Sequence, residues 1–526
     1  MAPPTPTATL TVLLDRCRSM SQLKQIHAQV LSLGLSGDAF LLSKLVFFAA
    51  ISGSGDIGYS LLAFSSVPSP TAFLYNTLIR GFSITRSPSS KPFSLYIRML
   101  RSPTPPDHLT FPFLLKSSAR LSDLSLGQSV HSHVAKLGFD PDRFIQNSLI
   151  HMYAACDEIA DARKVFDGIR QPNSVSWNAL IDGYAKCGDL AEARKLFDRA
   201  PEPDVVSWSA MIDGYVKGGD YRGALAVFRA MGDDPSAPKP NSVTMVSVLC
   251  ACAHLGALDQ GRRMHRYIKD NGLVLALPLA TSLVDMYAKC GSIGEAMGVF
   301  LSVPVEKMDV LIWNAVIGGL AMHGKGEESL AMFRKMESSG VEPDEITYLG
   351  LLSACVHGGL VEDAWRFFRS LKARGMKLHM EHYACMVDVL GRSGRVMEAF
   401  EFVRTMPLEP SASVLGALLS GCRTHGWVRL GEIVGRKLVE LEPEHDGRYV
   451  GLSNVYAVAR RWNEAKTWRE AMEKKGVKKV PGFSEVEVDG VLHKFIAHDR
   501  THPRSMEIHM VLGVLGSLMK MERDPD

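Results

Sequence analysis

Polar side chains that can recognise a ligand through hydrogen bonds recur in pairs along this chain. Each pair combines an Asn, Ser or Thr, in most cases directly after an aromatic residue, with an Asp or Asn further along. The pairs are Asn76 and Asp107, Asn147 and Asn173, Asn178 and Asp204, Ser209 and Asn241, Thr281 and Asp309, and Asn314 and Asp344. Asn donates and accepts, hydroxyls do either and carboxylates only accept, so such pairs suit the reading of donor and acceptor patterns. The simpler alternative is helix capping, which Asp and Asn favour in any protein.

The cysteine and histidine residues do not form a recognisable metal or catalytic site. Nine cysteines are present, and none belongs to a Cys-x-x-Cys pair. The segment 379–382, His-Met-Glu-His, contains a His-x-Glu element, and His131 and His133 are close in sequence, but neither has further ligands beside it. We therefore predict no catalytic residue, no metal and no cofactor.

Composition excludes several classes of protein. Of the 526 residues, 46% are hydrophobic and 22% are charged, and 59 Lys and Arg against 56 Asp and Glu give a net charge of +3. The chain is thus no disordered polycation, and any nucleic-acid binding would rest on ordered side chains rather than on bulk charge. No apolar run reaches the roughly 18 residues that a membrane span needs. The strongest candidate, 39–51, contains Lys44, and we predict no membrane contact.

Internal repetition determines the predicted fold. The strings YAACDEI, YAKCGDL and YVKGGDY begin at the equally spaced Tyr153, Tyr184 and Tyr215, and YAKCGSI begins at Tyr287. A period of about 31 to 37 residues is typical of helical solenoids. The predicted repeats are 39–71, 72–107, 108–142, 143–173, 174–204, 205–241, 242–276, 277–309, 310–344, 345–379 and 380–412, with an incomplete repeat before them and degenerate ones at about 413–447 and 448–480.

Each repeat has the pattern of two helices. In 174–204, Leu180 and Tyr184 belong to one apolar stripe, a second stripe follows the break at Gly188, and Pro201 ends it. One hairpin cannot bury its apolar stripe alone, so neighbouring hairpins must stack. The predicted fold class is all-α, a right-handed α-solenoid superhelix of stacked helix-turn-helix repeats.

The repeat sequences resemble one known family. Tetratricopeptide repeats share the length but have a small Gly where this chain has Ile181 and Ile212. WNALIDGYAKCGDLAEARKLFDRAPEPD (177–204) resembles a pentatricopeptide repeat, and the alternating repeat lengths resemble the PLS class of plant organelles. The segments 414–443, 449–482 and 493–509 resemble the E1, E2 and E+ motifs of that class.

The resemblance implies a domain organisation. Residues 1–20 fit a transit peptide or a frayed N-terminus, 21–412 the repeat array, 413–480 the E1 and E2 motifs, and 481–526 an E+-like extension. Some family members carry a DYW-type deaminase domain, whose zinc site needs a His-x-Glu and a Pro-Cys-x-x-Cys motif. No cysteine follows Cys422 in this sequence, so we do not expect the chain to be an enzyme.

The resemblance also implies that a repeat reads one base of single-stranded RNA with the residues at its fifth and last positions. It implies uracil for Asn76 with Asp107 and for Asn314 with Asp344, cytosine before uracil for Asn147 with Asn173, uracil before cytosine for Asn178 with Asp204, adenine for Ser209 with Asn241, and guanine for Thr281 with Asp309. Pro112 with Asp142, Val246 with Ala276, Leu349 with His379, and Ala384 lack such a polar pair and should read weakly.

Two further recurring positions suit a nucleotide strand. The second positions carry apolar residues, which the resemblance implies sandwich bases, although packing between repeats is the alternative. They are Phe73, Phe144, Val175, Val206, Val243 and Leu311. The thirteenth positions carry basic residues, which stacking would align towards phosphates, unless they are ordinary solvated side chains. They are Arg120, Lys186, Lys217, Lys289 and Arg392.

The function that the resemblance implies is sequence-specific binding of single-stranded organellar RNA, as a recognition factor for C-to-U RNA editing. A DYW-type cytidine deaminase and other editing factors would act in trans. We expect a monomer in the mitochondrion, with the chloroplast as the alternative. Two other functions stay open: RNA splicing, stability or translation, and peptide binding by a tetratricopeptide-like scaffold.

Overall fold

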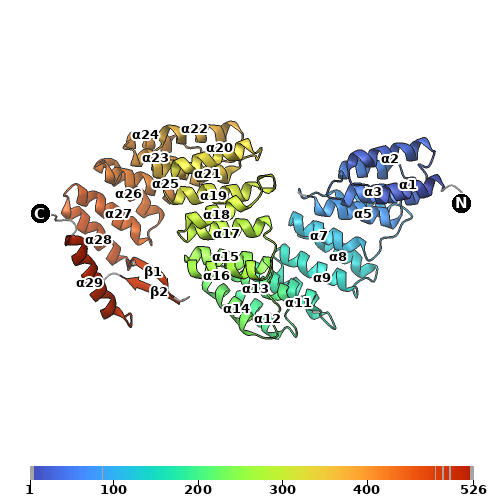
Figure 1. Cartoon of the computed structure of the whole chain (residues 1–526), viewed down its shortest axis with the longest axis horizontal. Helices are drawn as coiled ribbons and strands as arrows, with labels where there is room; N and C mark the ends of the chain where they lie inside the picture. Colours follow the sequence, from blue (N-terminus) through green and yellow to red (C-terminus); the bar gives the residue numbers. More distant parts are fainter. Residues whose placement is uncertain (1–4, 86, 480, 489–490, 497–498, 522–526) are drawn as a thin grey trace. The chain divides into compact units, whose positions relative to one another are not determined.

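The computed structural model describes residues 5–85, 87–479, 481–488, 491–496 and 499–521, and the chain divides into two compact parts. The first part, Met1–Pro240, consists of helices that follow one another as hairpins (Figure 1). They are α1 (Pro6–Asp15), α2 (Met20–Ser32), α3 (Ala39–Ile51), α4 (Ile57–Ser65), α5 (Ala72–Ile84), α6 (Lys91–Leu100), α7 (Thr110–Leu121), α8 (Leu124–Lys136), α9 (Arg143–Ala155), α10 (Ile159–Asp167), α11 (Ser174–Lys186), α12 (Leu190–Arg199), α13 (Val205–Lys217) and α14 (Tyr221–Asp233).

The second part, Asn241–Asp526, continues the same alternation. Its hairpins are formed by α15 (Ser242–Leu255), α16 (Leu258–Asp270), α17 (Leu277–Lys289), α18 (Ile293–Ser302), α19 (Val310–Met322), α20 (Gly326–Ser338), α21 (Glu345–Gly358), α22 (Val361–Ala373), α23 (Met380–Arg392), α24 (Val396–Arg404), α25 (Ala412–Thr424), α26 (Val428–Leu441), α27 (Asp446–Val458) and α28 (Trp462–Lys474). A short 3₁₀ helix, Val305–Lys307, lies between α18 and α19.

The hairpin of repeat 174–204 shows how the sequence specifies this structure. Asn173 caps α11 by accepting the backbone N–H of Ser176, as an Asn at this position favours. The chain then turns at Gly188, whose φ of +83° suits a residue without a Cβ, and Asp189 caps α12. The turn predicted at Gly188 is thus present, between two helices.

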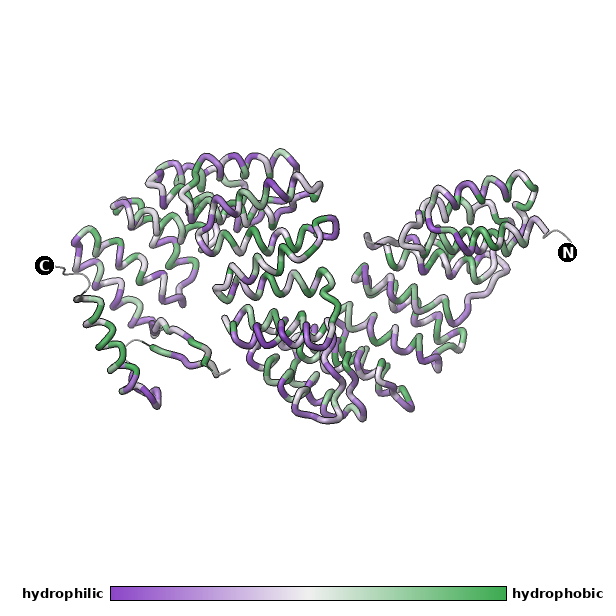
Figure 2. The backbone as a smooth tube through the Cα atoms, viewed as in Figure 1, coloured by the Kyte–Doolittle hydropathy of each residue, from purple (hydrophilic) through white to green (hydrophobic). Residues whose placement is uncertain are grey.

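Hydrophobic residues stack each hairpin on the next within a part, and Figure 2 shows apolar and polar stretches alternating along the helices. The second helix of one repeat contacts an aromatic residue on the first helix of the following one. Edge-to-face pairs of this kind are Phe166 with Trp177, Phe197 with Trp208, and Phe300 with Trp313, at centroid distances of 4.8, 4.7 and 5.0 Å. Aromatic edge-to-face contacts add to the hydrophobic stabilisation of such interfaces.

The first helices of successive repeats also contact each other directly, as α11 contacts α13 and α17 contacts α19. Glycines at the contact allow this approach. A Cβ on Gly214 would lie 2.6 Å from the Cβ of Ala185, and one on Gly319 would lie 2.8 Å from that of Ala288. The first helices therefore form a continuous row within each part. The predicted fold class, an all-α solenoid of stacked helical hairpins, is confirmed.

The two ends of the chain add to the array. Of the segment 1–20, residues 1–4 lie outside the described residues, while α1 buries Leu10 and Leu14. At the other end, β1 (Phe483–Val488) pairs antiparallel with β2 (Val491–Ile496), with Phe483 opposite Ile496, and α29 (Ser505–Met521) follows. This hairpin was not part of the sequence prediction. Among the described helices, none has the length and hydropathy of a membrane span.

Candidate nucleic-acid interface

The fifth residue of repeat 174–204 and its last residue form a hydrogen-bonded unit with the start of the next repeat. Asn178 projects from α11, and its Nδ2 donates to Oδ1 of Asp204 at 3.0 Å. The hydroxyl of Ser207, in the first turn of α13, donates to Oδ1 of Asn178 at 2.5 Å. The amide of Asn178 is therefore held from both its ends.

The same arrangement recurs in both parts of the chain. Asn76 donates to Asp107 at 2.8 Å and accepts from Thr110 at 2.8 Å. Likewise, Asn314 donates to Asp344 at 2.9 Å and accepts from Thr347 at 2.7 Å. These three predicted pairs are thus brought together by the fold.

The hydroxyl residues are functional candidates that sequence reasoning missed. They occupy the third position of a repeat, and they are Thr110, Ser176, Ser207, Thr244 and Thr347. Each hydroxyl belongs to the repeat that follows the pair, so it resembles an ordinary capping-box residue in the sequence. The signal that could have identified them is the recurrence of Ser or Thr two residues before the fifth position.

Helix capping and pairing occur together at these sites. Oδ1 of Asp204 accepts the N–H groups of Val206 and Ser207 at 2.9 and 3.0 Å, and it also accepts from Asn178. Burial tends to raise the pKa of the Asp204 carboxyl, but these hydrogen bonds, together with that from the Ser207 hydroxyl, outweigh it and lower the pKa below its usual value. Asp204 is therefore a carboxylate at neutral pH, and because its partners all bond to Oδ1, its Oδ2 is left as an acceptor.

The pair Asn147 and Asn173 is arranged differently. The Ser176 hydroxyl lies 2.7 Å from Oδ1 of Asn147 and 2.9 Å from Oδ1 of Asn173, and it bridges the two carbonyl oxygens. Oδ1 of Asn173 also accepts the Ser176 N–H at 2.9 Å. Both amides thus turn their oxygens towards Ser176, which leaves their NH₂ groups as donors.

Two predicted pairs are not joined in this way. The Thr281 hydroxyl donates to the carbonyl of Leu277 in its own helix at 2.9 Å. Asp309 caps α19 by accepting the N–H groups of Leu311 and Ile312. No hydrogen bond links Thr281 to Asp309 among the described residues. The third position of repeat 310–344 is Ile312, which has no hydroxyl to connect them.

Ser209 and Asn241 belong to different parts of the chain, so each is described separately. Ser209 is buried in α13. Asn241 caps α15, with its Oδ1 accepting the N–H of Thr244 at 3.0 Å. Their pairing stays a prediction.

The apolar residues at the second positions point away from the hydrophobic core. The exposed fractions are 53% for Phe73, 75% for Phe144, 54% for Val175, 54% for Val206, 63% for Val243 and 59% for Leu311. Packing between repeats, the alternative use of these residues, does not bury them, although Phe73 stacks on Phe47 of the preceding repeat at a ring-centroid distance of 6.3 Å. Phe40, Leu109 and Ile346 are second-position residues that sequence reasoning did not single out, and they are similarly exposed.

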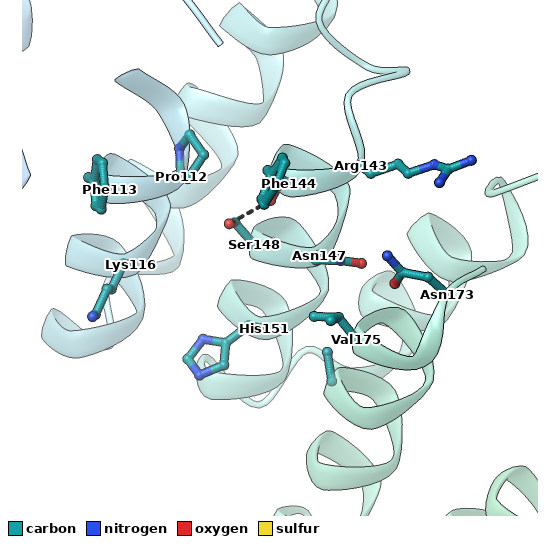
Figure 3. Close-up of a pocket in the computed structure, with 11 residues that line it drawn as sticks. Pro112, Phe113, Lys116, Arg143, Phe144, Asn147, Ser148, His151, Asn173 and Val175 are labelled. Atoms are coloured by element: carbon teal, nitrogen blue, oxygen red, sulfur yellow. Dashed lines mark hydrogen bonds between the residues drawn. The ribbon is translucent and has the colours of Figure 1, made fainter. Parts of the chain in front are cut away.

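A groove of about 610 Å³ brings these features together in the first part of the chain. In Figure 3, Phe144 lies beside Asn147 on α9, with Pro112 and Phe113 of α7 on one side, and Asn147 and Asn173 point towards each other. Val175 of α11 lines the groove as well. Two apolar side chains therefore flank a pair of amides, an arrangement that can accept a planar ring between them and hydrogen-bond its edge.

The basic residues at the thirteenth position each have a partner. The ion pairs, all between residues four apart on a first helix, are Lys186 with Asp182, Lys217 with Asp213, Lys289 with Asp285, and Arg392 with Asp388. Arg120 instead donates to the backbone carbonyls of Ser83 and Thr85. The row of cations is thus largely neutralised within the protein, and its contact with phosphates stays a prediction.

The histidine elements have structural partners. Nε2 of His382 pairs with the carbonyl of Glu345 at 2.9 Å, and the side chain is buried. Nδ1 of His131 lies 2.8 Å from the hydroxyl of Tyr153, and Nδ1 of His133 lies 3.1 Å from that of Tyr96. Over the described residues, no group of three or more His, Cys, Asp or Glu could hold a metal ion.

Models of known families match much of the chain. Repeat models of the pentatricopeptide family match residues 170–201, 203–254, 280–304, 308–357, 346–376 and 381–409. A model of the E motif matches residues 425–487.

Solved structures with a similar fold include the pentatricopeptide repeat protein PPR10 from maize, with a TM-score of 0.42, 18% identity, and coverage of 91% of this chain and 92% of that one. PPR10 in complex with an 18-nt psaJ RNA element gives a TM-score of 0.49 at 17% identity, covering 89% and 91%.

Relatives in Arabidopsis thaliana align over almost the whole chain. One pentatricopeptide repeat-containing protein is 52% identical over 519 residues, covering 98% of this chain and 96% of its own length. One named as mitochondrial is 38% identical and covers 97% and 90%, and one named as chloroplastic is 36% identical and covers 97% and 82%. The chain belongs to the pentatricopeptide repeat family, and its repeats followed by an E motif place it in the E type of the PLS class.

Proposed function

We propose that this protein binds single-stranded RNA in a sequence-specific manner, with one base per repeat. The observation that carries the proposal is the recurring unit of a fifth-position amide and a last-position Asp or Asn, flanked by exposed apolar second-position residues. Stacking on aromatic side chains, here Phe73 and Phe144, contributes about 1–3 kcal/mol per base in single-strand recognition. The aliphatic second-position residues offer van der Waals contact to the face of a base. Base-edge hydrogen bonds then supply the choice of sequence.

The donors and acceptors of two of these units each match one base. The amide of Asn178 offers an N–H and Asp204 offers a carboxylate oxygen, which match a carbonyl and the N3–H of uracil. The amides of Asn147 and Asn173 both offer N–H groups, which match the O2 and N3 acceptors of cytosine. Both assignments agree with those that the family resemblance implies.

Repeats 72–107 to 310–344, read parallel to the RNA, correspond to 5′-U-n-C/U-U/C-A-n-G-U-3′. The decisive experiment measures binding of the purified chain to this octamer and to a scrambled octamer of equal composition by fluorescence anisotropy. Preference for the ordered sequence is expected. Equal affinity for both octamers would overturn the base assignments.

At a finer level, we propose that the protein is a recognition factor for C-to-U editing of organellar RNA. The membership in the PLS class and the E motif support this proposal, and a DYW-type cytidine deaminase acting in trans would supply the chemistry. Relatives named as mitochondrial and chloroplastic support an organellar location, and we propose the mitochondrion.

Sequencing of organellar transcripts from a loss-of-function plant tests the editing role. One cytidine that stays unedited near a matching site is the expected result. Normal editing with an unspliced or unstable transcript would assign the protein to that process instead. If the protein is instead a peptide-binding scaffold, it should bind peptides and not RNA. The anisotropy measurement would then show no binding to either octamer.

A further inference from the structure

We propose that the hydroxyl of Ser176 determines which base repeat 143–173 prefers, by fixing the orientation of the Asn147 amide. The inference rests on the proposed reading of RNA bases. Ser176 itself would not touch the base, since it is 3% exposed. It acts as a positioning residue, supplied by the repeat that follows the one whose base it controls.

The Asn147 amide depends more on the hydroxyl of the following repeat than the other fifth-position amides do. Oδ1 of Asn147 lies 2.7 Å from the Ser176 hydroxyl. The described structure contains no other hydrogen bond to the Asn147 side chain. Rotation of Asn147 by half a turn about its last bond has little steric cost and would turn C=O towards the groove, with the NH₂ group then donating to the Ser176 oxygen. In the structure the Ser176 hydroxyl instead donates to Oδ1 of Asn147, and we assign to this donation the choice of N–H for the groove.

The corresponding amide of repeat 174–204 is fixed twice. Nδ2 of Asn178 donates to Asp204, and its Oδ1 accepts from Ser207. If the Ser207 hydroxyl is removed, the carboxylate still selects the N–H end of the amide, because two oxygens would otherwise repel each other. Ser207 is therefore much less important for orientation than Ser176.

For helix capping the order of importance is reversed: the Ser207 hydroxyl contributes to a cap, whereas the Ser176 hydroxyl does not. The Ser207 hydroxyl accepts the backbone N–H of Asp204 at 3.1 Å and completes a capping box at the start of α13. At the start of α11, the cap consists of the bond from the Ser176 N–H to Asn173, which does not need the hydroxyl. A purely structural hydroxyl would therefore matter more at Ser207 than at Ser176.

The consequence for base choice follows from the groove. With its oxygen turned towards Ser176, Asn147 presents only N–H groups beside Phe144 and Val175, as Asn173 does. Two donors match the O2 and N3 acceptors of cytosine and oppose the N3–H of uracil. A rotated Asn147 would present an acceptor instead, and the preference for cytosine would fall.

The test uses Ser176→Ala, Ser176→Thr and Ser207→Ala in the full chain. Each variant is titrated with octamers of the proposed sequence that carry C, U or A at the third base or U or C at the fourth. Thr fits this place in other repeats, since the hydroxyls of Thr110 and Thr347 make the same contact to Asn76 and Asn314. Thermal unfolding of each variant reports its stability.

We expect Ser176→Ala to reduce the preference for cytosine at the third base about five-fold, the effect of one net hydrogen bond. Ser176→Thr should retain it. Ser207→Ala should retain the preference at the fourth base while lowering the melting temperature more than Ser176→Ala does.

A full cytosine preference in Ser176→Ala, or equal losses of preference in both Ala variants, would overturn the inference while leaving RNA binding intact. If the unaltered chain shows no preference for the octamer, the proposed function itself fails and the inference fails with it.

Discussion

Nδ2 of Asn178 donates to Oδ1 of Asp204 at 3.0 Å, and this bond joins the first helices of two successive repeats. Asp204 caps α13 with the same oxygen. The geometry of this pair is thus set by the stacking of the repeats, and a base that docks against it, as we propose, would meet a fixed pattern of donor and acceptor. Preorganisation of this kind reduces the ordering needed on binding.

The identity of the last residue should determine the base. Asp204→Asn replaces an acceptor with an NH₂ donor and keeps the cap, because Asn and Asp are equally good at the N-terminus of a helix. Since a hydrogen bond to a charged group contributes about 1.5–3 kcal/mol, we expect the preference at the fourth base to move from uracil to cytosine by about tenfold or more. Anisotropy titrations with U and C octamers measure the change. An unchanged preference for uracil would refute the role of Asp204.

The exposed second-position residues should contribute affinity rather than stability. Val175→Ala removes two methyl groups from a side chain that is 54% exposed and lines the groove. We expect RNA binding to weaken by about 1 kcal/mol, close to the transfer free energy of one buried methylene. The matched control is Val458→Ala, since Val458 is 56% exposed on α27 outside the reading repeats. Equal effects of the two variants on RNA affinity would show that Val175 does not contact a base.

The aspartates that pair with the basic residues at the thirteenth position should limit the contact of those residues with RNA phosphates. Asp182→Asn releases Lys186 from its ion pair, so we expect tighter RNA binding and a steeper dependence on salt. One added phosphate contact increases the slope of log K against log salt by about 0.7 for single strands.

The control for this experiment is Asp198→Asn, which breaks the equivalent pair with Arg194 on a second helix. The control should leave the salt slope unchanged. Weaker binding by Asp182→Asn would mean that the pair orients Lys186 rather than neutralising it.

The hairpins and their stacking could be predicted from the sequence because they depend on local periodicity and on glycine at the turns. The pairing of Asn178 with Asp204 could also be predicted, because residues of these types recur at fixed positions of the repeat. The Ser207 contact was not, because it forms between helices of different repeats, and a serine in the first turn of a helix already has a capping role.

Two other features had signals that the sequence prediction did not use. Asp182 and Lys186 are four residues apart, the spacing of an ion pair on a helix. This spacing predicts both their ion pair and the neutralisation of the basic residues at the thirteenth position. Alternating residues on either side of Asp489-Gly490 are a hairpin signal, and the pairing of β1 with β2 agrees with it. The resemblance of residues 493–509 to the E+ motif did not lead to a prediction of this strand pairing.

Close approach of the first helices should make some glycines indispensable. Gly319→Ala places a Cβ 2.8 Å from the Cβ of Ala288 on α17, and overpacking of this kind destabilises by about 1–3 kcal/mol. Gly298→Ala is the matched control, since a Cβ there has no atom within 4 Å and should stabilise α18 by about 0.5–1 kcal/mol. Denaturant unfolding of the two variants, compared with the unaltered chain, measures both changes. Because the two substitutions are chemically identical and both lie in helices, opposite signs of the change in unfolding free energy would follow from the packing around Gly319, where the closest contact is with Ala288 of α17. A neutral or stabilising Gly319→Ala would instead show that this interface can separate without cost.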